Sequence, residues 1–298
     1  MSELVKGIFG LLNDWRNMPN YQLERRLDIF FAYFLPIILK SMAGECGIDT
    51  EKHEYIIPEF PLWIGASAKG KKKDNKSKKE LIPLPVVSDI EGKLSGFTIT
   101  RHSKKVDYVV IDKTDATAYF IELKTTNESI DEQQAFNLAE IYNNEKKSWR
   151  NLVAEALYIS ERNNSYKPLI NRLIKLEVID ALTPERFYLD VTKDKESPES
   201  LVLWSREITK KNDDVLALNL KIIPVFIIPS EKNTIFLNED GTKAEKYKNI
   251  KIINFSDIIS IINKEEVCPA WNVSCNSDTK CFCGLLKSIK TETDEGER

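Results

Sequence analysis

Histidine is almost absent from this sequence, which has only His53 and His102 among 298 residues. This scarcity argues against histidine-rich metal sites and against serine–histidine catalysis, because both need positioned imidazole groups. A net positive charge is missing too, since the formal charge is −3, and no global basic field indicates binding to nucleic acid. Any attraction to a polyanion must therefore come from local basic segments.

Long apolar runs are also missing. The start of the chain lacks the basic segment and apolar run of a secretory signal. The longest apolar stretch, near Ile29–Leu39, contains Pro36 and is too short to cross a bilayer. With 42% hydrophobic and 30% charged residues, the composition is that of a soluble globular protein. We therefore expect a cytoplasmic protein without a membrane partner and without disulfides.

The stretch Val106–Thr125 is the most informative part of the chain. Its two halves, Val106–Asp112 and Thr117–Thr125, are rich in β-branched and aromatic residues. The residues between them, beginning at Asp112, are typical turn formers. This pattern predicts a β-hairpin.

Three polar side chains interrupt this apolar hairpin, namely Asp107, Glu122 and Lys124. Because side chains alternate along a strand, Glu122 and Lys124 share one face. Asp107 begins the neighbouring strand and can lie beside Glu122. Two carboxylates and an ammonium group would then converge at one edge of a sheet. Such a pair of carboxylates suits a hard divalent cation, which activates water and stabilises charge on a phosphate.

The pattern Asp-x14-Glu-Leu-Lys, in which the Asp opens one strand and the Glu-x-Lys closes the next, resembles the PD-(D/E)xK nuclease superfamily. Val106 stands here where the superfamily pattern has proline. The resemblance implies that Asp107 and Glu122 bind Mg²⁺ or Mn²⁺ and that the backbone carbonyl of Leu123 adds an oxygen ligand. It also implies that Lys124 positions the attacking water. The implied activity is metal-dependent hydrolysis of phosphodiester bonds in DNA.

Two other interpretations stay open. A glutamate and a lysine two residues apart on a solvated strand face form an ordinary exposed pair, and the protein would then be an interaction scaffold. A non-cleaving protein of the same fold could instead bind nucleic acid or a protein partner. The apolar surroundings of Glu122 favour the nuclease, because an unpaired charge is costly there.

Hydrophobic periodicity around the hairpin predicts helix, three strands, helix and strand. The expected helices include Asn20–Met42, Gln133–Ser160, Leu169–Leu182 and Asp257–Asn263. The expected strands outside the hairpin are Tyr55–Ile57, Gly96–Arg101, Leu218–Pro229 and Ile250–Phe255. This order is the one that the resemblance implies, an α/β fold with a restriction-endonuclease-like αβββαβ core, a mixed sheet flanked by helices, and it also suits a mixed α/β sheet in general. We expect one nuclease-like domain over Met1–Lys264 and a cysteine-containing C-terminal tail over residues 265–298.

Four further polar residues bear on the site. The resemblance offers Glu24, on the helix before the first strand, as an additional acid that touches the metal, although helix borders are normally charged. It also offers Gln133, with Gln134 beside it, as a helix glutamine that reaches the site or the substrate. The alternative is that these residues have no such role, because amide side chains are common in a first helical turn. Glu59, between two prolines, is interpreted as a structural or turn residue.

The segment Lys69–Glu80 is rich in lysine and has no apolar anchors. Such a segment is usually a solvated loop. The alternative is an arm that contacts DNA phosphates, whose affinity would fall with salt through counterion release. The lysines of this candidate arm are Lys71, Lys72, Lys73, Lys76, Lys78 and Lys79.

The tail contains four of the five cysteines. Structural Zn²⁺ favours tetrahedral thiolate coordination, and the candidate ligands are Cys268, Cys275, Cys281 and Cys283. One branch of the superfamily carries an iron–sulfur cluster on one early and three late cysteines, and Cys46 is the early cysteine here. Ordinary thiols without a metal are the third possibility. The final residues, from Thr291, are expected to be disordered, and the sequence leaves the oligomeric state open, a homodimer included.

Overall fold

The computed structural model describes the central part of the chain and shorter pieces elsewhere. The described residues are 31–36, 38–39, 55–64, 66–68, 97–99, 103–124, 130–144, 147–160, 167–179, 220–229, 234–238, 241–263, 283 and 286–287. Glu24, Cys46, the lysines of the candidate arm and the first three tail cysteines lie outside them.

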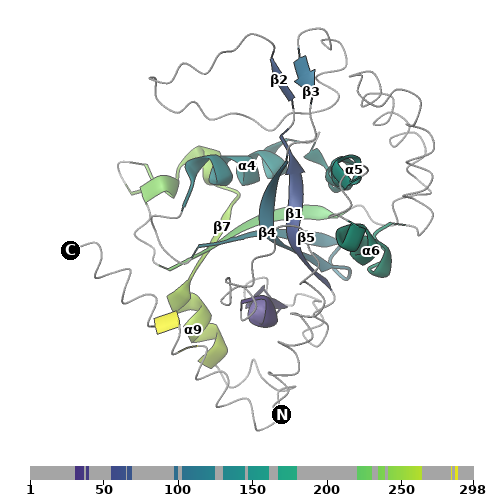
Figure 1. Ribbon diagram of the computed structural model, residues 1–298. Helices are drawn as coiled ribbons and strands as arrows, with labels where there is room; N and C mark the ends of the chain where they lie inside the picture. Colours follow the sequence, from purple (N-terminus) through teal and green to yellow (C-terminus); the bar gives the residue numbers. More distant parts are fainter. Residues whose placement is uncertain are drawn as a thin grey trace, which may run out of the picture.

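A five-stranded mixed sheet with the order β1-β4-β5-β6-β7 forms the centre of the described fold (Figure 1). β1, β4 and β5 pair antiparallel, whereas β5, β6 and β7 pair parallel. The strands are β1 (Ile56–Trp63), β4 (Ser103–Asp112), β5 (Thr117–Leu123), β6 (Lys221–Ile228) and β7 (Lys251–Asn254). The mixed α/β sheet expected from the sequence is therefore present.

Helices cover the sheet on both sides (Figure 1). α4 (Glu132–Asn143) and α5 (Trp149–Ser160) lie on one side. α9 (Phe255–Asn263) and the helical residues 31–36 and 38–39 lie on the other. α6 (Lys167–Lys175) lies beside β1. Within the described residues, no helix combines the length and the apolar character that a bilayer crossing requires.

Aromatic side chains fill the space between the sheet and its helices. On the α5 side, the Trp149 ring lies 5.9 Å from Phe60 of β1 and 6.1 Å from Phe120 of β5. On the other side, Phe31 lies 5.4 Å from Phe255 of α9. Aromatic rings bury large apolar areas and add edge-to-face attraction. These contacts hold the middle strands of the sheet away from water on both faces.

The hairpin that contains the candidate site is confirmed. β4 and β5 pair in register from Tyr108 with Ile121 to Asp112 with Thr117. Asp112 Oδ1 accepts hydrogen bonds from the backbone N–H groups of Thr114 and Asp115, which closes the turn. The strands and the turn therefore follow from local sequence.

Two expected helices have different bounds. The helix expected over Gln133–Ser160 is two helices, because α4 ends at Asn143 and Asn144 adopts an extended backbone with φ −107° and ψ 105°. Tyr142, which the apolar period of a single helix over Gln133–Ser160 would place on the buried side, is 40% exposed. α6 ends at Lys175 rather than at Leu182, because Glu177 takes a left-handed φ of 56° and closes the helix end.

Two expected strands also differ. The strand at Phe97–Ile99 (β3) does not join the central sheet; it pairs with Ala66–Ala68 (β2) in a separate two-stranded sheet. The strand expected at Tyr55–Ile57 continues as β1 through Pro58 and Pro61. Its place at the edge of the sheet explains this, because an edge strand tolerates residues that cannot donate a backbone hydrogen bond.

Candidate active site

The register of the hairpin brings Asp107 and Glu122 together. One step beyond the pair Tyr108–Ile121, Asp107 stands opposite Glu122 on the adjacent strand. Asp107 Oδ2 accepts a hydrogen bond of 2.8 Å from the backbone N–H of Leu123. The Asp107 carboxylate is therefore fixed between the two strands at the level of Glu122.

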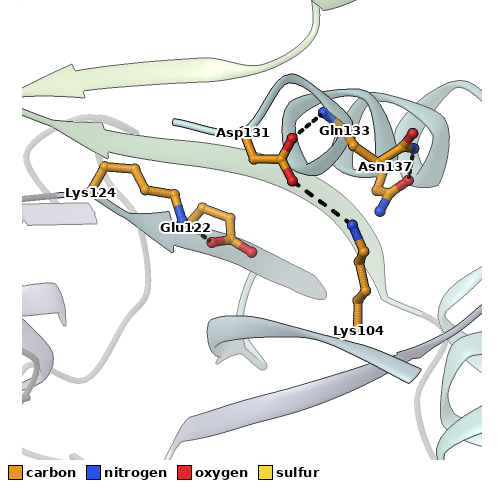
Figure 2. A network of polar contacts seen from close by, with 6 residues as sticks. All are labelled: Lys104, Glu122, Lys124, Asp131, Gln133 and Asn137. Atoms are coloured by element: carbon orange, nitrogen blue, oxygen red, sulfur yellow. Dashed lines mark hydrogen bonds and ion pairs between the residues drawn. The ribbon is translucent and has the colours of Figure 1, made fainter. Parts of the chain in front are cut away.

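Lys124 completes this group (Figure 2). Its Nζ donates to Glu122 Oε2 at 3.1 Å. Its backbone N–H donates to the carbonyl of Ile227 at 2.8 Å, so the residue stays attached to β6 although β5 ends at Leu123. Glu122 is 2% exposed and the Lys124 side chain 11% exposed. The interpretation as an ordinary solvated pair is therefore wrong.

Burial of Glu122 changes its acid–base chemistry. Burial raises the pKa of the Glu122 carboxyl well above its usual value, and the nearby Asp107 carboxylate raises this pKa further. Lys124 acts in the opposite direction but does not cancel these effects. An additional cation beside such a carboxyl group strongly stabilises its ionised form.

The donor groups fit a hard divalent cation. Two carboxylates on neighbouring strands are the ligands that Mg²⁺ uses when it keeps several of its waters. Among the described residues, no three histidine, cysteine, aspartate or glutamate side chains gather closely enough to hold a metal ion. A cation between Asp107 and Glu122 would therefore depend on these two carboxylates, on the backbone carbonyl of Leu123 and on water.

The start of α4 lies close to this group but makes contacts of its own (Figure 2). Asp131 caps the helix by accepting from the backbone N–H of Gln133 at 3.0 Å. The Gln133 side chain donates to Asn137 Oδ1 at 2.8 Å, along the helix and away from Glu122. Lys104 Nζ lies 3.9 Å from Asp131 Oδ2. That Gln133 reaches the site or the substrate stays a prediction, as does the role of Glu24.

Glu59 lies nearer to the site than the sequence indicated. β1 pairs with β4 at Pro58–Tyr108 and again at Phe60–Val106, so Glu59 stands opposite Asp107. Glu59 Oε2 lies 3.1 Å from Lys105 Nζ. The one available signal was an acidic residue within an apolar strand, and the flanking prolines obscured it.

Of the four tail cysteines, the structure describes only Cys283. Its thiol is buried, and burial raises its pKa. The zinc site stays a prediction, because Cys268, Cys275 and Cys281 lie outside the described residues.

No protein-family model, curated protein or solved structure matches this chain. The resemblance to the PD-(D/E)xK nucleases rests on Asp107, Glu122 and Lys124 and on the strand pattern around them. The function is accordingly inferred from the geometry of these residues.

Proposed function

We propose that this protein is a metal-dependent nuclease that hydrolyses phosphodiester bonds in DNA. The observation that carries the proposal is the buried Glu122 carboxylate, held beside Asp107 and paired with Lys124. The order of elements supports it. Helical residues come first, then the antiparallel strands β1, β4 and β5, then the helices α4, α5 and α6, and then the parallel strand β6, with β2 and β3 of the separate small sheet between β1 and β4. Helix, three strands, helix and strand is the order expected of a restriction-endonuclease-like core.

A purely structural role explains these charges poorly. Burying a carboxylate is costly unless it is paired, and a second carboxylate beside it adds repulsion. An apolar residue at Glu122 would pack between the strands at no such cost. Strongly perturbed carboxyl groups occur preferentially at functional sites. The cost at Glu122 is therefore best explained by a cation that binds there during function.

Each residue then has a defined task. Asp107 and Glu122 would hold Mg²⁺ or Mn²⁺ together with the carbonyl of Leu123. The cation would lower the pKa of its bound water and place positive charge beside the phosphate. The Lys124 ammonium orients the attacking water and stabilises charge on the phosphate oxygens. The N–H of Leu123 keeps Asp107 in place.

The test of this function is incubation of the pure protein with duplex DNA, single-stranded DNA and RNA, each with Mg²⁺, Mn²⁺ or EDTA. We expect cleavage of DNA only when a divalent cation is present. Glu122→Gln is the matched control, because it keeps the shape of the side chain and removes its charge. Absence of cleavage on every substrate would contradict the proposal and favour a non-cleaving binding protein.

The metal should also stabilise the protein in a pH-dependent way. Folding raises the pKa of Glu122, so the folded state binds the carboxyl proton more tightly than the unfolded state does. The stability that this proton contributes is lost as pH rises through the folded-state pKa. A cation favours the ionised form and at a hundredfold excess over its Kd adds about 2.7 kcal/mol. We expect Mg²⁺ to raise Tm by several degrees at neutral pH and by less at acid pH.

Calorimetry at several pH values, with Mg²⁺ and with EDTA, measures this effect. Glu122→Gln should lose both the metal-induced rise in Tm and the pH dependence that Glu122 contributes. An equal rise in Tm for the parent and for Glu122→Gln would show that Mg²⁺ binds elsewhere.

The candidate lysine arm makes a separate prediction about affinity. Each phosphate contact that a lysine makes contributes about 0.9 to the slope of log affinity against log salt. Replacing all six lysines of the arm by glutamine should weaken DNA binding and flatten this slope. Cleavage at saturating DNA should change little, because none of these lysines is assigned to the water or the metal. Binding curves at several salt concentrations decide this, and an unchanged slope would make the segment a solvated loop.

A further inference from the structure

Glu59 has an unusual backbone for a strand residue. Among the described non-glycine residues, a positive φ occurs at Glu59 (55°), Ala116 (47°) and Glu177 (56°). Ala116 belongs to the hairpin turn and Glu177 closes α6, both places where a left-handed residue is common. Glu59 instead lies in the middle of β1. A left-handed backbone strains a residue that has a Cβ atom, and strain of this kind is often kept for function.

The strained residue stands at the level of the site. The pairs Pro58–Tyr108 and Phe60–Val106 between β1 and β4 lie on either side of Glu59, which faces Asp107. Three adjacent strands therefore each bring one carboxyl residue to this level, namely Glu59, Asp107 and Glu122. The strain thus coincides with the candidate site.

The carboxylate of Glu59 holds a lysine next to Asp107. Its ion pair with Lys105 is partly buried, with 12% and 17% of the two side chains exposed. Lys105 and Asp107 are two residues apart on β4, so their side chains leave the same face about 7 Å apart. The Glu122–Lys124 pair lies on the other side of Asp107. Asp107 is thus flanked by two carboxylate–ammonium pairs.

We propose that Lys105 binds a backbone phosphate of the substrate next to the one that is cleaved, and that Glu59 is the positioning residue that holds Lys105 there. This inference rests on the proposed nuclease function and adds a contact to the polynucleotide backbone. A lysine ammonium binds phosphate as a point charge. Its position beside Asp107 brings that charge to the reacting centre. The Glu59 carboxylate keeps the ammonium paired while no phosphate is bound.

Glu59→Gly separates this role from a structural one. Glycine removes the carboxylate and also relieves the left-handed strain, so the melting temperature should not fall below that of Lys105→Gln. On the DNA substrate that the parent cleaves, both variants should raise KM about tenfold and change kcat little. A tenfold rise corresponds to the loss of one charge-assisted hydrogen bond. Lys105→Arg should restore most of the affinity, because it keeps the charge.

The double variant Glu59→Gly/Lys105→Gln gives the sharpest result. If Glu59 acts through Lys105, the double variant should have the KM of Lys105→Gln alone. The control is Lys113→Gln, which removes a lysine from the turn of the same hairpin. Lys113 Nζ lies 3.0 Å from Glu177 Oε2, next to the end of α6. This substitution should leave KM unchanged.

Different experimental results would overturn this inference and the proposed nuclease function. A parent protein that cleaves DNA, together with Glu59→Gly and Lys105→Gln variants that keep its KM, overturns the inference and leaves the nuclease in place. Additive effects of the two substitutions on KM overturn the positioning role of Glu59. A parent protein that cleaves no nucleic acid ends both proposals.

Discussion

Replacing Glu122 by glutamine is expected to lower the rate of metal-dependent DNA cleavage by about a thousandfold or more, while the fold is retained. The substitution removes one of two charges that hold the cation, and charge stabilisation in a buried site is worth several kcal/mol. Because folding raises the pKa of Glu122, the neutral glutamine should suit the metal-free protein better than the carboxylate does. We expect Glu122→Gln to be more stable than the parent by about 0.5–2 kcal/mol in EDTA at neutral pH.

Two further variants separate metal binding from chemistry. Asp107→Asn should lose both cleavage and the metal-induced rise in Tm, because its side chain keeps an acceptor for the Leu123 N–H but loses its charge. Lys124→Ala should lose cleavage and keep the metal-induced rise in Tm. Single-turnover cleavage and calorimetry measure the two properties. If all three variants cleave DNA at the rate of the parent, the assignment of the site is wrong.

The parts that sequence predicted well are local. The hairpin follows from two β-branched segments and a turn, and strand alternation then brings Asp107 beside Glu122. The same holds for β6, whose nearly continuous apolar sequence reflects its place between β5 and β7. In these regions the residues that determine the structure are neighbours in the chain.

The parts that sequence missed depend on distant residues. Phe97–Ile99 has strand character, but nothing within it specifies Ala66–Ala68 as its partner. Glu59 lies opposite Asp107 only because β1 continues past two prolines, and no local pattern predicts its left-handed backbone. The register between distant strands therefore concealed the position of Glu59 opposite Asp107.

The region between α4 and α5 shows the same limit. A helix continuous through residue 147 would have been consistent with the apolar period. The structure instead ends α4 at Asn143 and buries Lys147, whose side chain is 0% exposed. Its Nζ donates to Glu155 Oε1 of α5 at 2.6 Å. Lys147 is a buried ammonium whose partner is eight residues away, and neither side chain is part of the candidate site.

Lys147→Met is expected to destabilise the protein by about 3–5 kcal/mol at neutral pH, because it leaves a buried carboxylate without its counter-charge. Burial already raises the pKa of Glu155, and Lys147 opposes that effect. Within the described residues, Glu155 Oε2 has no hydrogen-bond partner that could replace the lysine. The loss should therefore exceed that caused by removing an exposed ion pair such as Lys246–Glu132, which is worth roughly 0–1 kcal/mol.

The pH dependence and a double variant identify the cause. Without Lys147, the folded-state pKa of Glu155 should rise further, so the stability of Lys147→Met should increase as pH falls and the carboxyl group takes up its proton. Lys147→Met/Glu155→Leu should recover most of the loss at neutral pH, because an apolar pair in the same space leaves no buried charge. Urea unfolding at neutral and acid pH measures all three proteins. Two results would show that the Lys147–Glu155 ion pair does not stabilise the fold in this way. One is a Lys147→Met variant as stable as the parent at neutral pH, and the other is a double variant no more stable than Lys147→Met.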